Sequence, residues 1–363
     1  MLELKIHEDP NPRTKTIELL SEHKWLDAPT SCVTRKWGDR PVLGSFYDVE
    51  IKSWKYFGVG KIDQMVREHS VIYLSVHLLP CEIETLRDSL RRLGEPRIIV
   101  SMQALPGEWP DSVRLIVTHP MAYIFSYCLD KGGFGIQHKK KVRDLKYNFG
   151  IMQQGPEPGR RHLIMMLKKL GLLDRALYSN NHLTADHTFS SDELAINKHL
   201  VDIPSKIIGV SYDRKNLFEN MKFLLPEIEK CHLWISTESD VYMSDLLMCV
   251  AEKPMWAVST GTPLLAIWRE NVAQQMRDWG YRFHNLGIKG EDETDQGAVR
   301  RWCEKIAFMD HLFRDPDWAQ DWLDLQGENT SWNAELSRKL HLTIAGDTER
   351  QIQELPAEFQ NLQ

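Results

Sequence analysis

The sequence predicts an α/β protein with two domains that face a cleft, followed by a helical region at the C-terminal end. A length of 363 residues is enough for more than one domain. In both halves, short apolar segments alternate with helical patterns, which is typical of parallel sheets covered on both faces. A glycine- and lysine-rich segment separates the halves. We therefore expect an N-terminal domain over residues 1–145, a second domain over residues 146–315 and a helical extension over residues 316–363.

In the first domain, three apolar segments predict strands at Ser70–Val76, Arg97–Val100 and Val113–Val117. Between the first two, apolar residues recur at helical spacing in Glu82–Leu93, so this segment is predicted to be a helix. Residues 1–40 are polar and contain four prolines, and we expect them to be irregular. The strand pattern therefore begins only after them.

The second domain repeats the alternation. Strands are predicted at Lys146–Met152, Ala176–Ser179, Cys231–Ile235 and Pro263–Ile267. A helix from Arg160 to Leu170 is expected to end at Gly171, because glycine is the usual C-terminal cap. Another is expected over Asp245–Ala251, and a third over Gly297–Phe313 with one apolar face. The last twenty residues are polar and are expected to fray.

Composition excludes several classes of protein. The hydrophobic fraction of 42% and the charged fraction of 26% are those of a soluble globular protein. Neither a run of 18 apolar residues nor a signal peptide is evident, so no membrane partner is predicted. We expect a cytoplasmic protein, or one in the host cytoplasm if the chain is viral. The six cysteines are widely spaced, which favours free thiols over a zinc site or a disulfide framework.

Motifs for several well-known chemistries are missing from the sequence. It has no G-x-G-x-x-G after a strand, no G-x-x-x-x-G-K-[ST], no G-x-S-x-G and no H-E-x-x-H. The acidic pair in Asp315-Pro316-Asp317 is better placed to cap a helix than to hold a metal ion. The sequence therefore predicts no metal site and no bound cofactor.

The densest positive charge lies in the run from His138 to Arg143, on a chain whose net charge is −6. The run comprises Lys139, Lys140, Lys141 and Arg143. An acidic protein is a poor nonspecific binder of nucleic acid, but a local basic patch can still contact phosphate groups. Its simpler interpretation is a solvated loop or helix face.

Four charged positions lie where ligands bind in α/β proteins, beyond the carboxyl ends of predicted strands. Glu238 follows the strand at Cys231–Ile235 and could accept hydrogen bonds from sugar hydroxyls, or belong to a helix N-cap. Arg160 and Arg161 begin a helix after a glycine-proline loop. Arginines there oppose the helix dipole, so a bound anion would explain them, although a surface cluster would also fit.

The pair Glu252-Lys253 is expected at or near the end of the helix Asp245–Ala251. Taken alone, it indicates an exposed charge pair. Alternatively, Lys253 neutralises a diphosphate and Glu252 holds ribose hydroxyls. Pro254 disfavours the α-helical conformation at Lys253, so a helix boundary or kink is predicted there.

Three residues of the first domain are candidates for a catalytic base. His77 and His119 each follow a predicted strand, and imidazole titrates near neutral pH. Each could equally be a hydrogen-bonded structural histidine. Asp48, with Glu50 close by, supplies a rival carboxylate.

In their order along the chain, several of these segments resemble the donor domain of GT-B glycosyltransferases. The likeness is carried by Glu238, Ala251-Glu252-Lys253, Gly261-Thr262-Pro263 and the segment from Arg277 to Phe283. It is closest to fucosyltransferase- and exostosin-like enzymes and to glycosyltransferases encoded by bacteriophages. Upstream, Pro156–Asp174 resembles the arginine-bearing loop and helix of those proteins.

The resemblance covers residues 146–285 and implies two Rossmann-like domains facing a cleft. It also implies that Arg160 or Arg161, together with Glu252 and Lys253, contacts the phosphates and ribose of a UDP- or GDP-linked sugar. Such enzymes need no bound metal. Pro254 departs from the family, which continues here with Thr, Leu or Phe. The N-terminal half has no clear match, so the catalytic base does not carry over.

The predicted function is therefore metal-independent transfer of a sugar from a nucleotide-diphosphate sugar to a hydroxyl. The basic run and the bacteriophage likeness favour a hydroxylated pyrimidine base in DNA as the acceptor, which an enzyme must flip out of the duplex. A glycan or protein acceptor is the competing hypothesis. A non-catalytic nucleotide-sugar-binding module and a sugar-nucleotide epimerase are further alternatives, because fold alone does not decide function.

Overall fold

The computed structural model describes a large part of the chain. The described residues are 30–34, 43–48, 53–58, 66–67, 71–74, 80–101, 105, 107–134, 144–152, 164, 167–168, 170–178, 217–237, 252–267, 270–283 and 295–360. The chain divides into two compact units. Unit 1 comprises Met1–Ile124, Asp245–Cys249 and His341–Gln363, and unit 2 comprises Phe125–Ser244 and Val250–Leu340.

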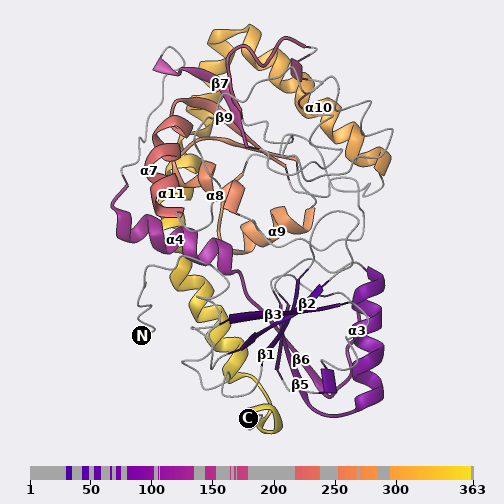
Figure 1. Cartoon of the computed structure of the whole chain (residues 1–363). Helices are drawn as coiled ribbons and strands as arrows, with labels where there is room; N and C mark the ends of the chain where they lie inside the picture. The colour runs from indigo at the N-terminus through magenta and orange to yellow at the C-terminus, as the bar shows by residue number, and fades with distance from the viewer. Residues whose placement is uncertain are drawn as a thin grey trace. The chain divides into compact units, whose positions relative to one another are not determined.

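Unit 1 contains a six-stranded mixed sheet with the strand order β3-β2-β1-β4-β5-β6 (Figure 1). Its strands are β1 (Thr30–Thr34), β2 (Leu43–Asp48), β3 (Ser53–Gly58), β4 (Val71–Leu74), β5 (Arg97–Ser101) and β6 (Val113–Val117). β1, β4, β5 and β6 are parallel, whereas β2 runs antiparallel to both β1 and β3. The predicted strands at β4, β5 and β6 are confirmed. The prediction that residues 1–40 are irregular is wrong at β1, where alternation over five residues was too short to stand out.

Helix α3 (Pro80–Leu93) confirms the amphipathic helix predicted between β4 and β5. Its apolar residues Ile83, Leu86 and Leu90 are buried in one cluster with Ile72 of β4 and Ile99 of β5. This packing buries the apolar stripe of the helix against the sheet, which is why the helical spacing was visible in the sequence. After β6, α4 (Pro120–Gly132) begins, and its residues belong partly to each unit.

Unit 2 contains a four-stranded sheet in which every strand is parallel, with the order β10-β9-β7-β8. Its strands are β7 (Tyr147–Ile151), β8 (Ala176–Tyr178), β9 (Cys231–Thr237) and β10 (Leu264–Ile267). All four were predicted, with boundaries shifted by one or two residues. Gly171 has the left-handed φ of 69° and its N–H donates to Lys168 O, so the predicted C-terminal cap is confirmed.

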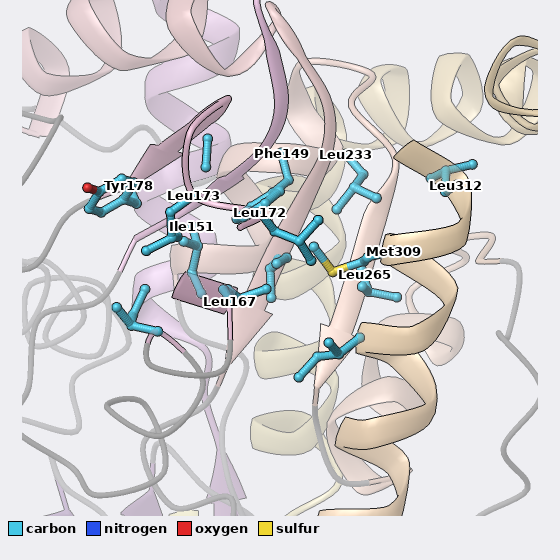
Figure 2. Close-up of a cluster of buried hydrophobic side chains, with 14 of the residues drawn as sticks. Phe149, Ile151, Leu167, Leu172, Leu173, Tyr178, Leu233, Leu265, Met309 and Leu312 are labelled. Atoms are coloured by element: carbon cyan, nitrogen blue, oxygen red, sulfur yellow. The ribbon is translucent and has the colours of Figure 1, made fainter. Parts of the chain in front are cut away.

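One face of this sheet is covered by the C-terminal helices. Phe149, Ile151, Leu233 and Leu265 lie in a buried cluster, and Met309 of α10 (Asp295–Arg314) lies next to Leu265 (Figure 2). Trp318 and Trp322 of α11 (Pro316–Gln353) pack against the same cluster. This layer confirms the apolar face predicted for the helix at Gly297–Phe313.

The opposite face is covered by α7 (Leu217–Ile228) and α8 (Glu252–Ser259), both of which contact β9 (Figure 1). Trp234 of β9 points to this side, because neighbouring strand residues alternate between faces. Its ring lies against β7, where a Cβ added to Gly150 would be 2.2 Å from the nearest ring atom. α9 (Glu270–Asp278) follows β10. Unit 2 is therefore a sheet with helices on both faces.

The C-terminal residues are better ordered than the sequence predicted. Asp315 Oδ1 accepts hydrogen bonds from the N–H groups of Asp317 and Trp318, which confirms the predicted cap of α11. The expectation that the last twenty residues fray is wrong for the described part of this segment. After α11, Leu355 is buried, and so is Phe359 in α12 (Ala357–Gln360).

The end of α11 is held by the edge strand of unit 1. The Gln351 amide accepts a hydrogen bond from Val117 N–H at 2.9 Å and donates one to Val117 C=O at 3.1 Å. The side chain thus pairs with β6 as a neighbouring strand would, and it satisfies the edge of the sheet. The guanidinium of Arg114, also in β6, lies 4.7 Å from the Phe359 ring. Polar residues near the C-terminus therefore fix this segment to the sheet.

Candidate functional site

The topology of the unit 2 sheet defines where a ligand would lie. From the central strand β7, the chain adds β8 on one side and then returns to place β9 and β10 on the other side. The direction of winding therefore reverses between β7 and β9. In open parallel sheets, the loops that leave the carboxyl ends of two such strands diverge and leave a crevice between them. The candidate site is thus the carboxyl edge beside Ile151 and Thr237, the last residues of these strands.

Each of the two loops carries candidates from the sequence. The chain leaving β7 leads to Arg160 and Arg161, and the residue immediately after β9 is Glu238. All three residues lie outside the described part of the chain. The described strands nevertheless place their loops at one edge of one sheet, as the sequence predicted for Glu238.

The Glu252-Lys253 pair lies at the start of a helix rather than at its end. Residues 245–251, where a helix was predicted, are outside the described residues, and the described helix α8 begins with Glu252. Pro254 is the third residue of α8, a position in the first turn where its missing N–H breaks no helical hydrogen bond. The predicted boundary at Pro254 was therefore correct, but the helix lies on the other side of it. Since α8 connects β9 to the parallel strand β10, its first turn lies toward the carboxyl edge.

Ser236 is a candidate that the sequence analysis missed. It is the penultimate residue of β9, its exposed fraction is 1%, and its Oγ has no hydrogen-bond partner among the described residues. Leu233 and Ile235 face the α10 side, so alternation turns Ser236 toward the side of α8. A buried hydroxyl without a partner costs about 1–3 kcal/mol, which an oxygen of a bound ligand or water would offset. Only the strand register, which fixes the alternation, could have singled it out.

His119 lies two residues beyond β6, at the carboxyl edge of the unit 1 sheet. Its C=O accepts the N–H of Tyr123, so it occupies the N-cap position of α4. Burial lowers the pKa of the His119 imidazole from 6.5 to about 4. The ring is therefore neutral at pH 7 and can accept a proton, but it is a weaker general base than free imidazole.

Asp48 and the histidines are at opposite edges of the unit 1 sheet. Tyr47 pairs with Thr30, the first residue of β1, so Asp48 lies beyond the amino end of that strand. Because β1 is parallel to β4, the same edge holds the amino ends of β4, β5 and β6. Asp48 is thus about 15 Å along the strands from the carboxyl edge near His119. His77 follows β4 by three residues and, like Glu50, lies outside the described residues.

The basic run that includes Lys139, Lys140, Lys141 and Arg143 also lies outside the described residues. Within the described ranges, no group of three or more His, Cys, Asp or Glu side chains could hold a metal ion. Cys128 and Cys231 have free thiols, and burial raises the pKa of the Cys128 thiol to about 11, which makes it unreactive at neutral pH. None of the helices in the described part is both long and apolar enough to cross a membrane.

The fold defines a mixed α/β protein with parallel strands in both sheets and a helical C-terminal region. No protein-family model matches the chain, and no curated protein matches its sequence. The function is therefore inferred from the residues and from the geometry of the unit 2 sheet.

Proposed function

We propose that the chain is a metal-independent glycosyltransferase of the GT-B class that uses a UDP- or GDP-linked sugar. The observation that supports this most directly is the reversal of strand order between β7 and β9 in a fully parallel sheet. It directs the loop with Arg160 and Arg161 and the loop with Glu238 to the same edge. The first turn of α8, with Glu252 and Lys253, lies toward that edge as well.

These residues suit a nucleotide diphosphate. Glycosyl transfer from such a donor develops negative charge on the leaving phosphates, and fixed cations stabilise that charge. Arginine can pair with two phosphate oxygens at once, and lysine supplies a compact charge. The carboxylates of Glu238 and Glu252 would accept hydrogen bonds from sugar hydroxyls. The buried Ser236 hydroxyl would donate to a phosphate oxygen.

For the acceptor, we propose a hydroxylated pyrimidine base in DNA, bound through the basic run at Lys139–Lys141 and Arg143. A base must leave the stack to react, and cations beside it hold the backbone. The test is the triple substitution of the three lysines by Ala. Loss of duplex binding with retained donor hydrolysis is expected, whereas unchanged duplex binding and transfer would favour a glycan or protein acceptor.

The donor site is tested with Lys253→Ala. Removing a charge that contacts phosphate is expected to lower kcat/KM for the donor by about 10–100-fold. The measurement is donor hydrolysis and transfer over a panel of UDP- and GDP-sugars, followed by product analysis. A matched control is Lys168→Ala, because Lys168 is exposed and lies just before the turn into β8, at the amino edge of the same sheet.

The outcomes separate the alternatives. Donor turnover that survives Lys253→Ala would show that this assignment of the site is wrong. Binding of a nucleotide sugar without any turnover would indicate a non-catalytic binding module. A changed sugar formed without an acceptor would indicate an epimerase.

A further inference from the structure

Helix α9 ends in a turn that fixes the direction of the chain after it. Gly280 has a φ of 93°, which favours glycine because other residues are strained there. Its N–H donates to Arg277 O at 2.8 Å, and Tyr281 N–H donates to Met276 O at 3.0 Å. These two bonds form a Schellman motif, and the side chains of Tyr281 and Met276 are both buried beside it. The Gly280-Tyr281 pair singled out in the sequence is therefore a helix end.

The residues after this turn are bound by α11. Trp332 Nε1 donates to Gly280 O at 2.9 Å. The Asn333 side chain accepts the N–H of Arg282 at 2.8 Å and donates to the C=O of the same residue at 2.7 Å. The Arg282 guanidinium lies 4.0 Å from the centre of the Trp332 ring. The backbone from Gly280 to Arg282 is thus held by specific polar contacts with two neighbouring α11 residues.

Between these anchors, the Tyr281 side chain extends to the beginning of α8. Its hydroxyl lies 2.9 Å from Ser337 Oγ and 3.8 Å from the sulfur of Met255. Ser337 Oγ donates its proton to Asn333 O at 2.8 Å, so the Tyr281 hydroxyl is the donor toward Ser337. Burial raises the pKa of Tyr281, which keeps this hydroxyl protonated. Met255 is fully buried and is the fourth residue of α8, two positions after Lys253.

We propose that Tyr281 is a positioning residue for the donor site. Its ring and hydroxyl connect α11, through Ser337, to the first turn of α8, and so hold the backbone that carries Glu252 and Lys253. The catalytic meaning of this role rests on the proposed function, whereas the mechanical role does not. Substrate-binding charges that are held in place lose less freedom on binding, which strengthens their interaction with the donor.

The mechanical role is tested in the full chain without ligand, by hydrogen exchange of the backbone amides. Tyr281→Phe removes only the hydroxyl, and Ser337→Ala removes its partner. Both are expected to speed exchange in α8 by about 10-fold, with little change in α7. Tyr147→Phe is the matched control, because its hydroxyl lies 3.2 Å from Glu227 and it begins β7 at the amino edge. Unchanged exchange in α8 for both variants would overturn the proposal.

The link to the donor is tested by a double-mutant cycle on donor KM. Tyr281→Phe is expected to raise KM by about 3–10-fold and to leave kcat within about 2-fold. In the Lys253→Ala background this effect should disappear, since Tyr281 acts through the residues of the α8 turn. Additive effects would show instead that Tyr281 only stabilises the fold.

The two failures can be told apart. If Lys253→Ala has the KM of the unchanged chain, the proposed donor site is wrong, and the hydrogen-exchange result still decides the mechanical role. If Lys253→Ala raises KM but Tyr281→Phe changes neither KM nor exchange, the positioning role is wrong and the proposed function stands.

Discussion

The two sheets differ in how strand direction distributes the candidate residues. In unit 2 every strand is parallel, so each loop after a strand leaves from the same edge. In unit 1, β2 is antiparallel to its neighbours, and Asp48 at its end lies at the edge opposite to His119. Both residues follow a strand in the sequence. Position after a strand therefore locates a residue only when the direction of that strand is known.

The second difference concerns the way each sheet is completed. The centre of the unit 2 sheet is filled by the Trp234 ring against Gly150. In unit 1, the edge strand β6 receives a side-chain amide from Gln351, a residue 234 positions away along the chain. The first device depends on a missing side chain, and the second on one long polar side chain.

The largest effect is expected for Gly150→Ala. The new Cβ would lie 2.2 Å from the Trp234 ring, far inside van der Waals contact, and both residues are in central strands. We expect a loss of about 3 kcal/mol in the free energy of unfolding, measured by urea denaturation. The control is Gly346→Ala, in exposed α11 with no atom near the new Cβ, which should gain about 0.5–1 kcal/mol. Equal stability of the two variants would contradict the tight packing of β7 on β9.

A comparable effect, limited to acid, is expected from His119. Its pKa is lowered from 6.5 to about 4 in the fold, so the unfolded chain binds the proton more readily. The stability that results is present above pH 6.5 and is lost as the pH falls toward 4, on the order of 3 kcal/mol in total. The measurement compares urea denaturation of the unchanged chain and His119→Gln at pH 7 and pH 4.5. Parallel pH profiles of the two proteins would show that His119 is not buried as described.

A smaller effect is expected from Gln351→Ala, which removes both hydrogen bonds to Val117 at the edge of the unit 1 sheet. The expected cost is about 1–2 kcal/mol, since water can replace part of each bond. Gln353→Ala is a fair comparison, because Gln353 is exposed near the end of the same helix. If the two variants unfold at the same urea concentration, the contact with β6 contributes nothing.

The smallest effect is expected from Asp48→Asn. If catalysis takes place at the carboxyl edges, this residue is about 15 Å too far along the strands to act as the base. Transfer assays should give a kcat within about 2-fold of that of the unchanged chain. A fall of 100-fold or more would place the reaction at the amino edge of the unit 1 sheet and reverse the comparison drawn above.

Much of the fold could be predicted because its signals are local. The apolar runs at β5, β6, β7 and β9 are nearly continuous, since parallel strands are buried on both faces. The helix at α3 shows its buried stripe directly. The candidate donor residues were found for the same reason, because a charge that follows an apolar run is visible without any knowledge of pairing.

The remaining features depend on partners distant in sequence. The short strand β1 has too few residues for a clear alternation, and its place in the sheet is set by pairing with β2 and β4. The Ser236 hydroxyl is notable only because the register buries it without a partner in the described structure. The roles of Asn333 and Gln351 come from segments more than fifty residues away.

The sequence by itself determined the α/β class, most of the strands and the order of charges that indicates a nucleotide-sugar donor. Local apolar periodicity and turn chemistry decide these features, and both are written in neighbouring residues. Only the tertiary structure decided the direction of β2, the reversal of winding between β7 and β9, and the support of α8 by Tyr281. Each of these depends on which distant segments pair, and pairing is selected by the packing of the whole sheet rather than by any one segment.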